Sequence, residues 1–136
     1  MKHRRQFLRA GLASLALVVL DRSEAPAATG IEAIYERELP PVSLMGWQVT
    51  VLELTFPPGT TSPRHAHPGF ILGYILGGDY RFQLEGEREK VLSTGDVFRE
   101  APGSIHLPSG SVSMIKPARI LALAFAEKGK DITKLL

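Results

Sequence analysis

The stretch GTTSPRHAHPGFILGYILGG, from Gly59 to Gly78, contains two histidines that are separated by one residue, His65 and His67. Alternate side chains of an extended strand point to the same face, so both imidazoles are expected to point the same way. Outside the N-terminal segment the only other histidine is His106, at the end of GDVFREAPGSIH. Three neutral imidazoles that meet at one point can bind a divalent transition metal. If His106 converges on this pair, His65, His67 and His106 would form a metal site.

Short runs rich in β-branched, aromatic and aliphatic residues recur around this stretch, and Gly, Pro, Asp and Ser separate them. Residues 47–56 alternate, with Val49 and Val51 on one face and with Leu52, Leu54 and Phe56 on the other. No long amphipathic helix is evident, so the pattern predicts an all-β sandwich or barrel. The other predicted strands are the histidine strand and residues 71–76, 80–84, 90–92, 96–100, 111–115 and 119–126.

The two histidine stretches resemble the paired motifs of the cupin superfamily, over about residues 45–126. The first motif runs from Gly over five residues to His-x-His, then to Glu and a closing Gly; the second runs from Gly through a Pro/Gly turn to His. The residues that match are Gly59, His65, His67, Gly78, Gly95, Gly103 and His106. Asp96 and the run Glu100–Gly103 also resemble small quercetin-dioxygenase-like cupins. The resemblance implies one antiparallel double-stranded β-helix, the cupin jelly-roll barrel.

One position departs from the family pattern. Ile71 or Leu72 stands where the metal-binding Glu of the first motif is expected. Three histidines without that carboxylate would leave a bound ion its full charge, which makes it a stronger Lewis acid. The resemblance implies Fe(II), Mn(II), Ni(II) or Zn(II) as the ion. A barrel that has lost its metal is the alternative interpretation of the missing Glu.

Glu100 is the one nearby acid that could serve as a fourth ligand or as a hydrogen-bond partner of a ligand. Because carboxylates are rarely buried, the favoured interpretation is a carboxylate that faces water at the end of its strand. Phe70, Ile71, Phe82 and Leu107 could form the wall of an apolar pocket for a small aromatic or hydrophobic ligand. A place in the barrel core explains these four residues equally well, and we favour it.

The first 27 residues have the pattern of a signal peptide. A basic region that contains Arg4 and Arg5 precedes the apolar residues 10–20, and a small-residue cleavage site lies at Ala25–Ala27. The adjacent arginines resemble a twin-arginine export signal; an ordinary secretory signal is the alternative. The apolar stretch is short for a membrane span, so we expect no stable membrane insertion after cleavage. This pattern predicts a periplasmic or secreted protein.

The basic charge of the chain is concentrated in this leader. Residues 1–27 hold five basic and two acidic side chains, and the remainder holds 11 basic and 12 acidic ones. The remainder therefore lacks the positive charge that nucleic-acid binding requires. With no cysteine, the chain has neither disulfides nor thiolate chemistry.

We divide the chain into the signal peptide, a lead-in or edge strand at 28–44, the barrel at 45–126 and a tail at 127–136. The resemblance implies a metal-dependent enzyme that acts on a small molecule, with dioxygenase chemistry as one example. A non-catalytic ligand-binding or sensing module is the alternative function. Barrels of this family frequently form homodimers, so the resemblance implies a homodimer here as well.

Overall fold

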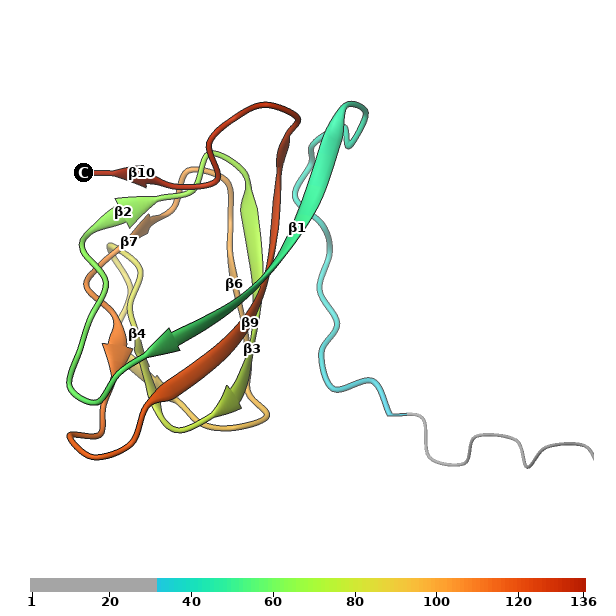
Figure 1. Cartoon of the computed structure of the whole chain (residues 1–136). Coiled ribbons are helices and arrows are strands. Elements are labelled where there is room, and N and C mark those ends of the chain that lie inside the picture. Colours follow the sequence, from blue (N-terminus) through green and yellow to red (C-terminus); the bar gives the residue numbers. More distant parts are fainter. Residues whose placement is uncertain (1–31) are drawn as a thin grey trace, which may run out of the picture. The chain divides into compact units, whose positions relative to one another are not determined.

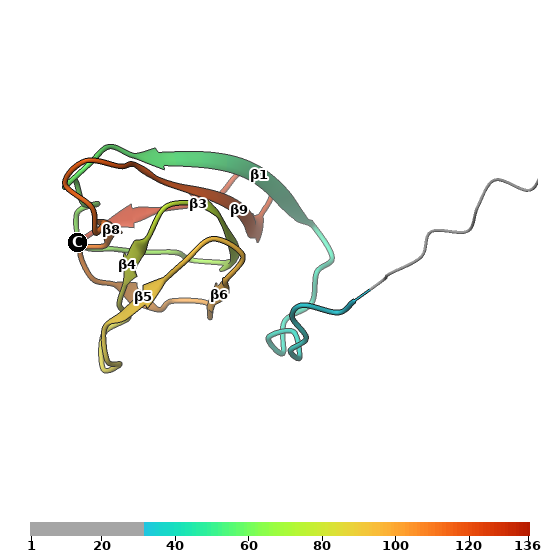
Figure 2. The same ribbon diagram turned by 90° about the horizontal axis from the view of Figure 1, so that it is seen from below.

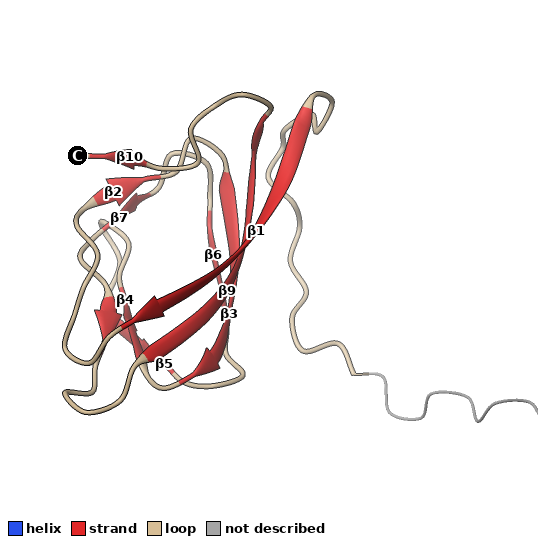
Figure 3. Cartoon of the chain, viewed as in Figure 1, coloured by secondary structure: helices blue, strands red, loops and turns tan. Residues whose placement is uncertain are grey.

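The computed structural model describes residues 32–136, so the predicted signal peptide lies outside the described residues. Ile34–Leu136 form one compact unit. The described part consists of strands and loops, with no helix (Figure 3). Its strands are β1 (Trp47–Phe56), β2 (His65–Ala66), β3 (Phe70–Gly77), β4 (Tyr80–Phe82), β5 (Lys90–Leu92), β6 (Val97–Glu100), β7 (Ile105–His106), β8 (Gly110–Ser111), β9 (Ala118–Glu127) and β10 (Lys134–Leu135). Residues 32–136 therefore offer no helix of the length and hydropathy needed to cross a membrane.

The largest sheet has the strand order β1-β9-β3-β6, and all its neighbouring strands are antiparallel. Its central strand β9, ARILALAFAE, alternates between buried and more exposed residues over its whole length. The buried face carries small residues, Ala118, Ala122, Ala124 and Ala126, together with Ile120. Small side chains on the inner face leave room inside the barrel, and this room matters for the site.

Two smaller sheets face the large sheet across the interior of this unit (Figures 1 and 2). One has the order β10-β2-β7 and the other has the order β5-β4-β8. The three sheets enclose a single apolar core, to which Ile75 and Ile120 contribute side chains that are 0% and 1% exposed. Burial of each such side chain contributes about 1.5–3 kcal/mol. The predicted all-β, single-domain double-stranded β-helix is confirmed.

The alternation predicted for residues 47–56 agrees with β1. Leu52 and Phe56 pack against the core, whereas Val49 and Val51 are 50% and 59% exposed. The strand predicted at 111–115 is wrong beyond Ser111. The hydroxyl group of Ser113 accepts hydrogen bonds from the backbone N–H groups of Ile115 and Lys116, so the chain turns there instead of extending.

Two segments flank the predicted barrel. Residues 32–44 contain no strand, so the lead-in forms no edge strand over its described part. The segment predicted as a tail at 127–136 contains β10, which pairs with β2. The chain therefore continues the barrel beyond residue 126, beside the strand that carries His65.

Candidate metal centre

The three predicted histidines meet inside the barrel. His65 lies on β2 and pairs with His106 on β7, and His67 directly follows β2. The ring centroids of His65 and His67 are 4.9 Å apart, and those of His65 and His106 are 4.8 Å apart. One ring nitrogen of each histidine lies within 4.8 Å of the corresponding nitrogens of the other two. All three residues are buried, so this cluster could hold a metal ion away from bulk water.

Backbone carbonyl groups determine which nitrogen of two histidines is free. Nδ1 of His65 lies 2.8 Å from the carbonyl oxygen of Pro63, and Nδ1 of His67 lies 2.8 Å from that of Ile132. A carbonyl oxygen only accepts hydrogen bonds, so in the neutral rings Nδ1 carries the proton. The lone pair then lies on Nε2. Metal-binding histidines usually donate their other N–H group in this way.

The third histidine and Glu100 carry polar atoms that lack hydrogen bonds. Both ring nitrogens of His106 and Oε2 of Glu100 are buried without a hydrogen-bond partner among residues 32–136. Glu100 Oε1 lies 3.3 Å from His106 Nδ1, and Glu100 Oε2 lies 3.7 Å from His67 Nε2. Buried polar groups without partners are costly. A cation bound by one nitrogen of His106, with the N–H group at the other nitrogen directed to a partner such as Glu100, would satisfy these groups, so the residues present fit a divalent metal.

Glu100 therefore does not face water, and the interpretation favoured from the sequence is wrong. Glu100 is 2% exposed, because the alternation of β6 places it on the inner face together with Phe98. It pairs in register with Ile71 on β3. Directly paired residues of neighbouring strands share a face. The carboxylate thus stands one strand away from the position where the family Glu is expected.

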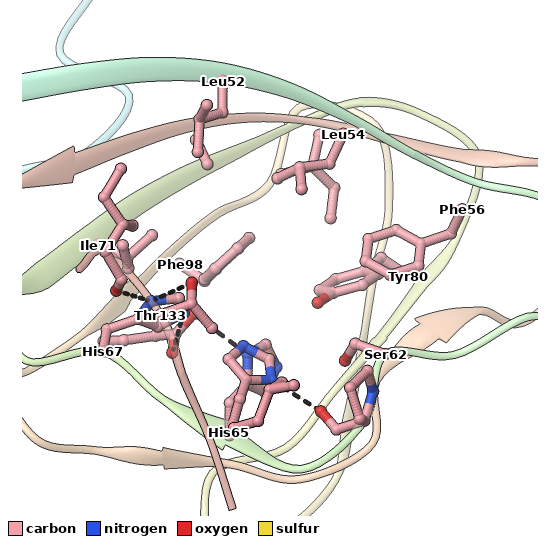
Figure 4. A pocket seen from close by; sticks show the side chains of 17 residues that line it. Leu52, Leu54, Phe56, Ser62, His65, His67, Ile71, Tyr80, Phe98 and Thr133 are labelled. Atoms are coloured by element: carbon pink, nitrogen blue, oxygen red, sulfur yellow. Dashed lines mark hydrogen bonds and ion pairs between the residues drawn. The ribbon is translucent and has the colours of Figure 1, made fainter.

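A cavity of about 390 Å³ lies beside the cluster. In Figure 4, Leu52 and Leu54 extend from β1 into the pocket, across from His65 and His67. Its surface is largely apolar, and no lysine or arginine lines it. The lining residues are Leu52, Leu54, Phe56, Ser62, Pro63, His65, His67, Ile71, Tyr80, Phe98, Glu100, His106, Ile120, Ala122, Ile132, Thr133 and Leu135.

Of the four residues proposed for the pocket wall, only Ile71 lines this cavity. Phe70 points to the other face of β3 and stacks on Phe125, with ring centroids 4.5 Å apart. Phe82 lies in the core, where its ring centroid is 5.0 Å from that of His106. Leu107 is half-buried and outside the lining. The favoured interpretation as barrel core agrees with Ile71 and Phe82, which belong to the core cluster, whereas Phe70 and Leu107 lie outside both that cluster and this cavity.

Several residues that the sequence analysis did not select line the cavity instead. Leu52, Leu54 and Phe56 come from the face that the alternation of β1 had already grouped together, so that pattern was an available signal. Tyr80 also lines the cavity, and burial, together with the nearby charge of Glu100, raises the pKa of its hydroxyl group. Tyr80 is therefore a protonated hydrogen-bond donor at neutral pH. No sequence signal distinguishes it from Tyr74.

The pKa of His65 is lowered from its ordinary value, chiefly by burial; the carbonyl oxygen of Pro63 opposes this shift. A lowered pKa keeps the imidazole neutral, and thus able to bind metal, at neutral pH. Protons compete with the metal as the pH falls through this lowered pKa, below the ordinary histidine value of about 6.5. We expect metal affinity to be nearly constant above the ordinary value and to fall towards pH 5.

A competition titration with a chromophoric chelator at several pH values measures this dependence. The affinity of the chelator must be corrected for its own protonation at each pH. An affinity that stays flat between about pH 5 and 8 would contradict binding through histidine.

The geometry defines a class of protein: a small antiparallel barrel whose interior cavity ends at a buried histidine cluster able to hold a metal. The sequence matches the model of the Cupin domain over residues 52–122, and the chain belongs to this family. His65, His67 and His106 all lie inside the matched range. No curated protein matches the chain.

Solved structures support the same fold. A cupin-like protein from Thermotoga maritima is 22% identical, with a TM-score of 0.57, over 65% of this chain and 64% of that one. A DMSP lyase from Ruegeria pomeroyi is 24% identical, with a TM-score of 0.55, over 64% of this chain and 42% of the lyase. An oxalate decarboxylase from Bacillus subtilis is 18% identical, with a TM-score of 0.55, over 65% of this chain and 24% of the decarboxylase. The chain thus spans less than two thirds of each of these proteins, and the likeness shows the fold alone.

Proposed function

We propose that this chain is an exported cupin metalloprotein that holds a divalent metal through His65, His67 and His106 and acts on a small organic substrate. The observation that carries the proposal is the buried cluster, in which one nitrogen of each histidine lies within 4.8 Å of the others. The unsatisfied buried atoms of His106 and Glu100 support it. Export rests on the signal-peptide pattern of residues 1–27.

We propose Fe(II), Mn(II), Ni(II) or Zn(II) as the metal, since imidazole and carboxylate donors suit these ions. A divalent ion on three histidines supplies Lewis acidity and keeps coordination positions open for a chelating substrate and for dioxygen. The carbonyl oxygens of Pro63 and Ile132 orient two of the ligands. Twin-arginine export moves folded proteins, which would allow the ion to be bound before the protein leaves the cytoplasm.

The lining of the cavity bears on the part of the substrate that does not bind the ion. This lining is largely apolar, and no lysine or arginine belongs to it. It therefore suits an apolar substrate body, while the metal itself binds the chelating group. We therefore propose a small aromatic or hydrophobic substrate, oxidised in the manner of a quercetin-dioxygenase-like cupin. The apolar wall formed by Leu52, Leu54 and Phe56 would exclude water from it.

One observation favours a second function, that of a non-catalytic ligand-binding or sensing module. Apart from Glu100 and the histidines, the only ionisable side chain in the lining is Tyr80, which stays protonated at neutral pH. A pocket with so few groups able to accept a proton suits binding as well as it suits turnover. A barrel that binds no metal would be the third outcome.

Expression of the full chain in an export-competent host tests these alternatives. The exported protein is analysed for its N-terminus, its metal content and its mass in solution, and oxygen uptake is measured with a panel of uncharged aromatic compounds. The proposal predicts cleavage near Ala27, about one metal per chain, and oxygen uptake with at least one compound. Metal with ligand binding but without turnover would select the sensing module, and absence of metal would refute the metalloprotein. The mass distinguishes a monomer from the proposed homodimer.

A further inference from the structure

Residues 129–136, which we call the C-terminal segment, return to β2, which carries His65 and directly precedes His67. Leu135 pairs with His65 and Lys134 with Ala66, in an antiparallel ladder. The backbone N–H group of Leu136 donates to the carbonyl oxygen of Arg64, at 3.2 Å. Without this segment, β2 would become the edge strand of its sheet, with β7 as its only neighbour.

The same segment holds the ring of His67. The carbonyl oxygen of Ile132 lies 2.8 Å from Nδ1 of His67, and Oγ1 of Thr133 lies 3.3 Å from the same nitrogen. The side chain of Ile132 packs against the barrel core, which anchors that carbonyl. Ile132, Thr133 and Leu135 also line the cavity. One short segment therefore fixes the tautomer of a ligand and closes part of the pocket.

The residues by which the C-terminal segment makes these contacts lie outside the part of the chain that matches the family. The family match ends at residue 122, before the C-terminal segment begins. On the other side of the ring, Nε2 of His67 lies 3.7 Å from Glu100. If the segment left, Nδ1 would lose its acceptor, and the neutral ring could place its proton on either nitrogen. Only the form with a free Nε2 presents a lone pair to the cluster in the present orientation.

We propose that the C-terminal segment is a positioning element for His67, so that its docking and metal binding are thermodynamically coupled. This inference rests on the proposed metal site. Coupling is reciprocal: if docking strengthens metal binding by a given factor, metal binding strengthens docking by the same factor. Partners that orient a metal-binding histidine typically change metal affinity by about 10–100-fold. The segment acts through His67 and does not itself bind the ion.

The first test removes residues 131–136 from the full chain and measures Zn(II) affinity by chelator competition. We expect a loss of about 10–100-fold, with the barrel still folded by circular dichroism. The matched control is Lys134→Ala, which changes an exposed side chain of the same segment and keeps its backbone, and which should bind Zn(II) like the parent. Unchanged affinity in a folded truncated protein would overturn the proposal.

A double-mutant cycle shows whether the effect passes through His67. His67→Ala removes the stoichiometric site and leaves only weak Zn(II) binding by His65 and His106. If the segment acts only on the ring of His67, truncation should lower this weak affinity by less than about twofold. An equal loss in both backgrounds would mean that the segment merely supports the barrel, and it would overturn the positioning role.

Hydrogen exchange on the intact protein keeps the proposal testable if the truncated chain does not fold. Zn(II) should slow exchange of the backbone amides of the C-terminal segment, and Lys134→Ala should show the same slowing. If the protein binds Zn(II) but Zn(II) does not alter this exchange, the coupling is refuted and the proposed metal site is not. A full-length chain that binds no Zn(II) would refute the metal site as well.

Discussion

Replacing His106 with leucine is expected to abolish stoichiometric metal binding while the barrel remains folded. His106 supplies one of three imidazoles, and the two that remain, His65 and His67, cannot by themselves form the three-nitrogen site. Leucine roughly preserves the volume that packs against Phe82, whose ring centroid lies 5.0 Å from that of His106. It also removes two buried nitrogens that have no hydrogen-bond partner among the described residues. Loss of metal and retention of fold are therefore separable.

Elemental analysis and thermal unfolding measure the two effects. The parent should gain thermal stability when Zn(II) is added, because a ligand that binds only the folded state stabilises it. The variant should show no such gain. An equivalent change at the surface, Arg64→Ala, should leave both readings unchanged, since Arg64 is half-exposed and pairs with Glu85 at 2.7 Å. The same metal content in the parent and in His106→Leu would mean that the ion lies elsewhere.

Replacing Glu100 with glutamine is expected to lower metal affinity by about 10–100-fold. The amide keeps the shape of the side chain but loses the negative charge next to a divalent cation. Glu100 faces two ligands, with Oε1 3.3 Å from His106 Nδ1 and Oε2 3.7 Å from His67 Nε2. As a ligand it would offset one unit of the charge of the ion; as a partner of His106 it would orient that ring.

The register between β3 and β6 offers a matched rescue. Ile71 is the direct cross-strand partner of Glu100, so a carboxylate at either position should face the same interior. Ile71→Glu in the Glu100→Gln background should recover much of the lost affinity if the negative charge itself is what the ion requires. Ile71→Glu alone should tighten binding. No loss in Glu100→Gln would exclude any role for this carboxylate in metal binding.

The sequence predicts much of this barrel because its strands alternate strongly. The two-residue period of residues 47–56 identifies the face that lines the cavity, and the His-x-His spacing places two imidazoles on one side of a strand. Turn glycines frame the first motif: Gly59 and Gly78 have φ angles of 67° and 74°, which other residues rarely adopt. The convergence of His106 on this pair was implied by resemblance, since nothing local connects residues so far apart.

The parts that the sequence did not predict depend on register between distant strands. Glu100 is buried because β6 pairs with β3 in the register that sets it against Ile71, and a lone acid at the end of a strand carries no sign of that pairing. The C-terminal segment contains only a two-residue strand, too short for a periodic pattern. The segment contacts His67 through the backbone carbonyl group of Ile132. Because every residue has such a group, the sequence gives no sign of this contact.

The most direct measurement of the central claim is anomalous diffraction from crystals of the full chain grown with Co(II) or Zn(II). The account predicts one strong anomalous peak inside the barrel, at about 2.1 Å from one nitrogen each of His65, His67 and His106. A peak that contacts fewer than three of these rings, or an interior without any peak at saturating metal, would contradict it.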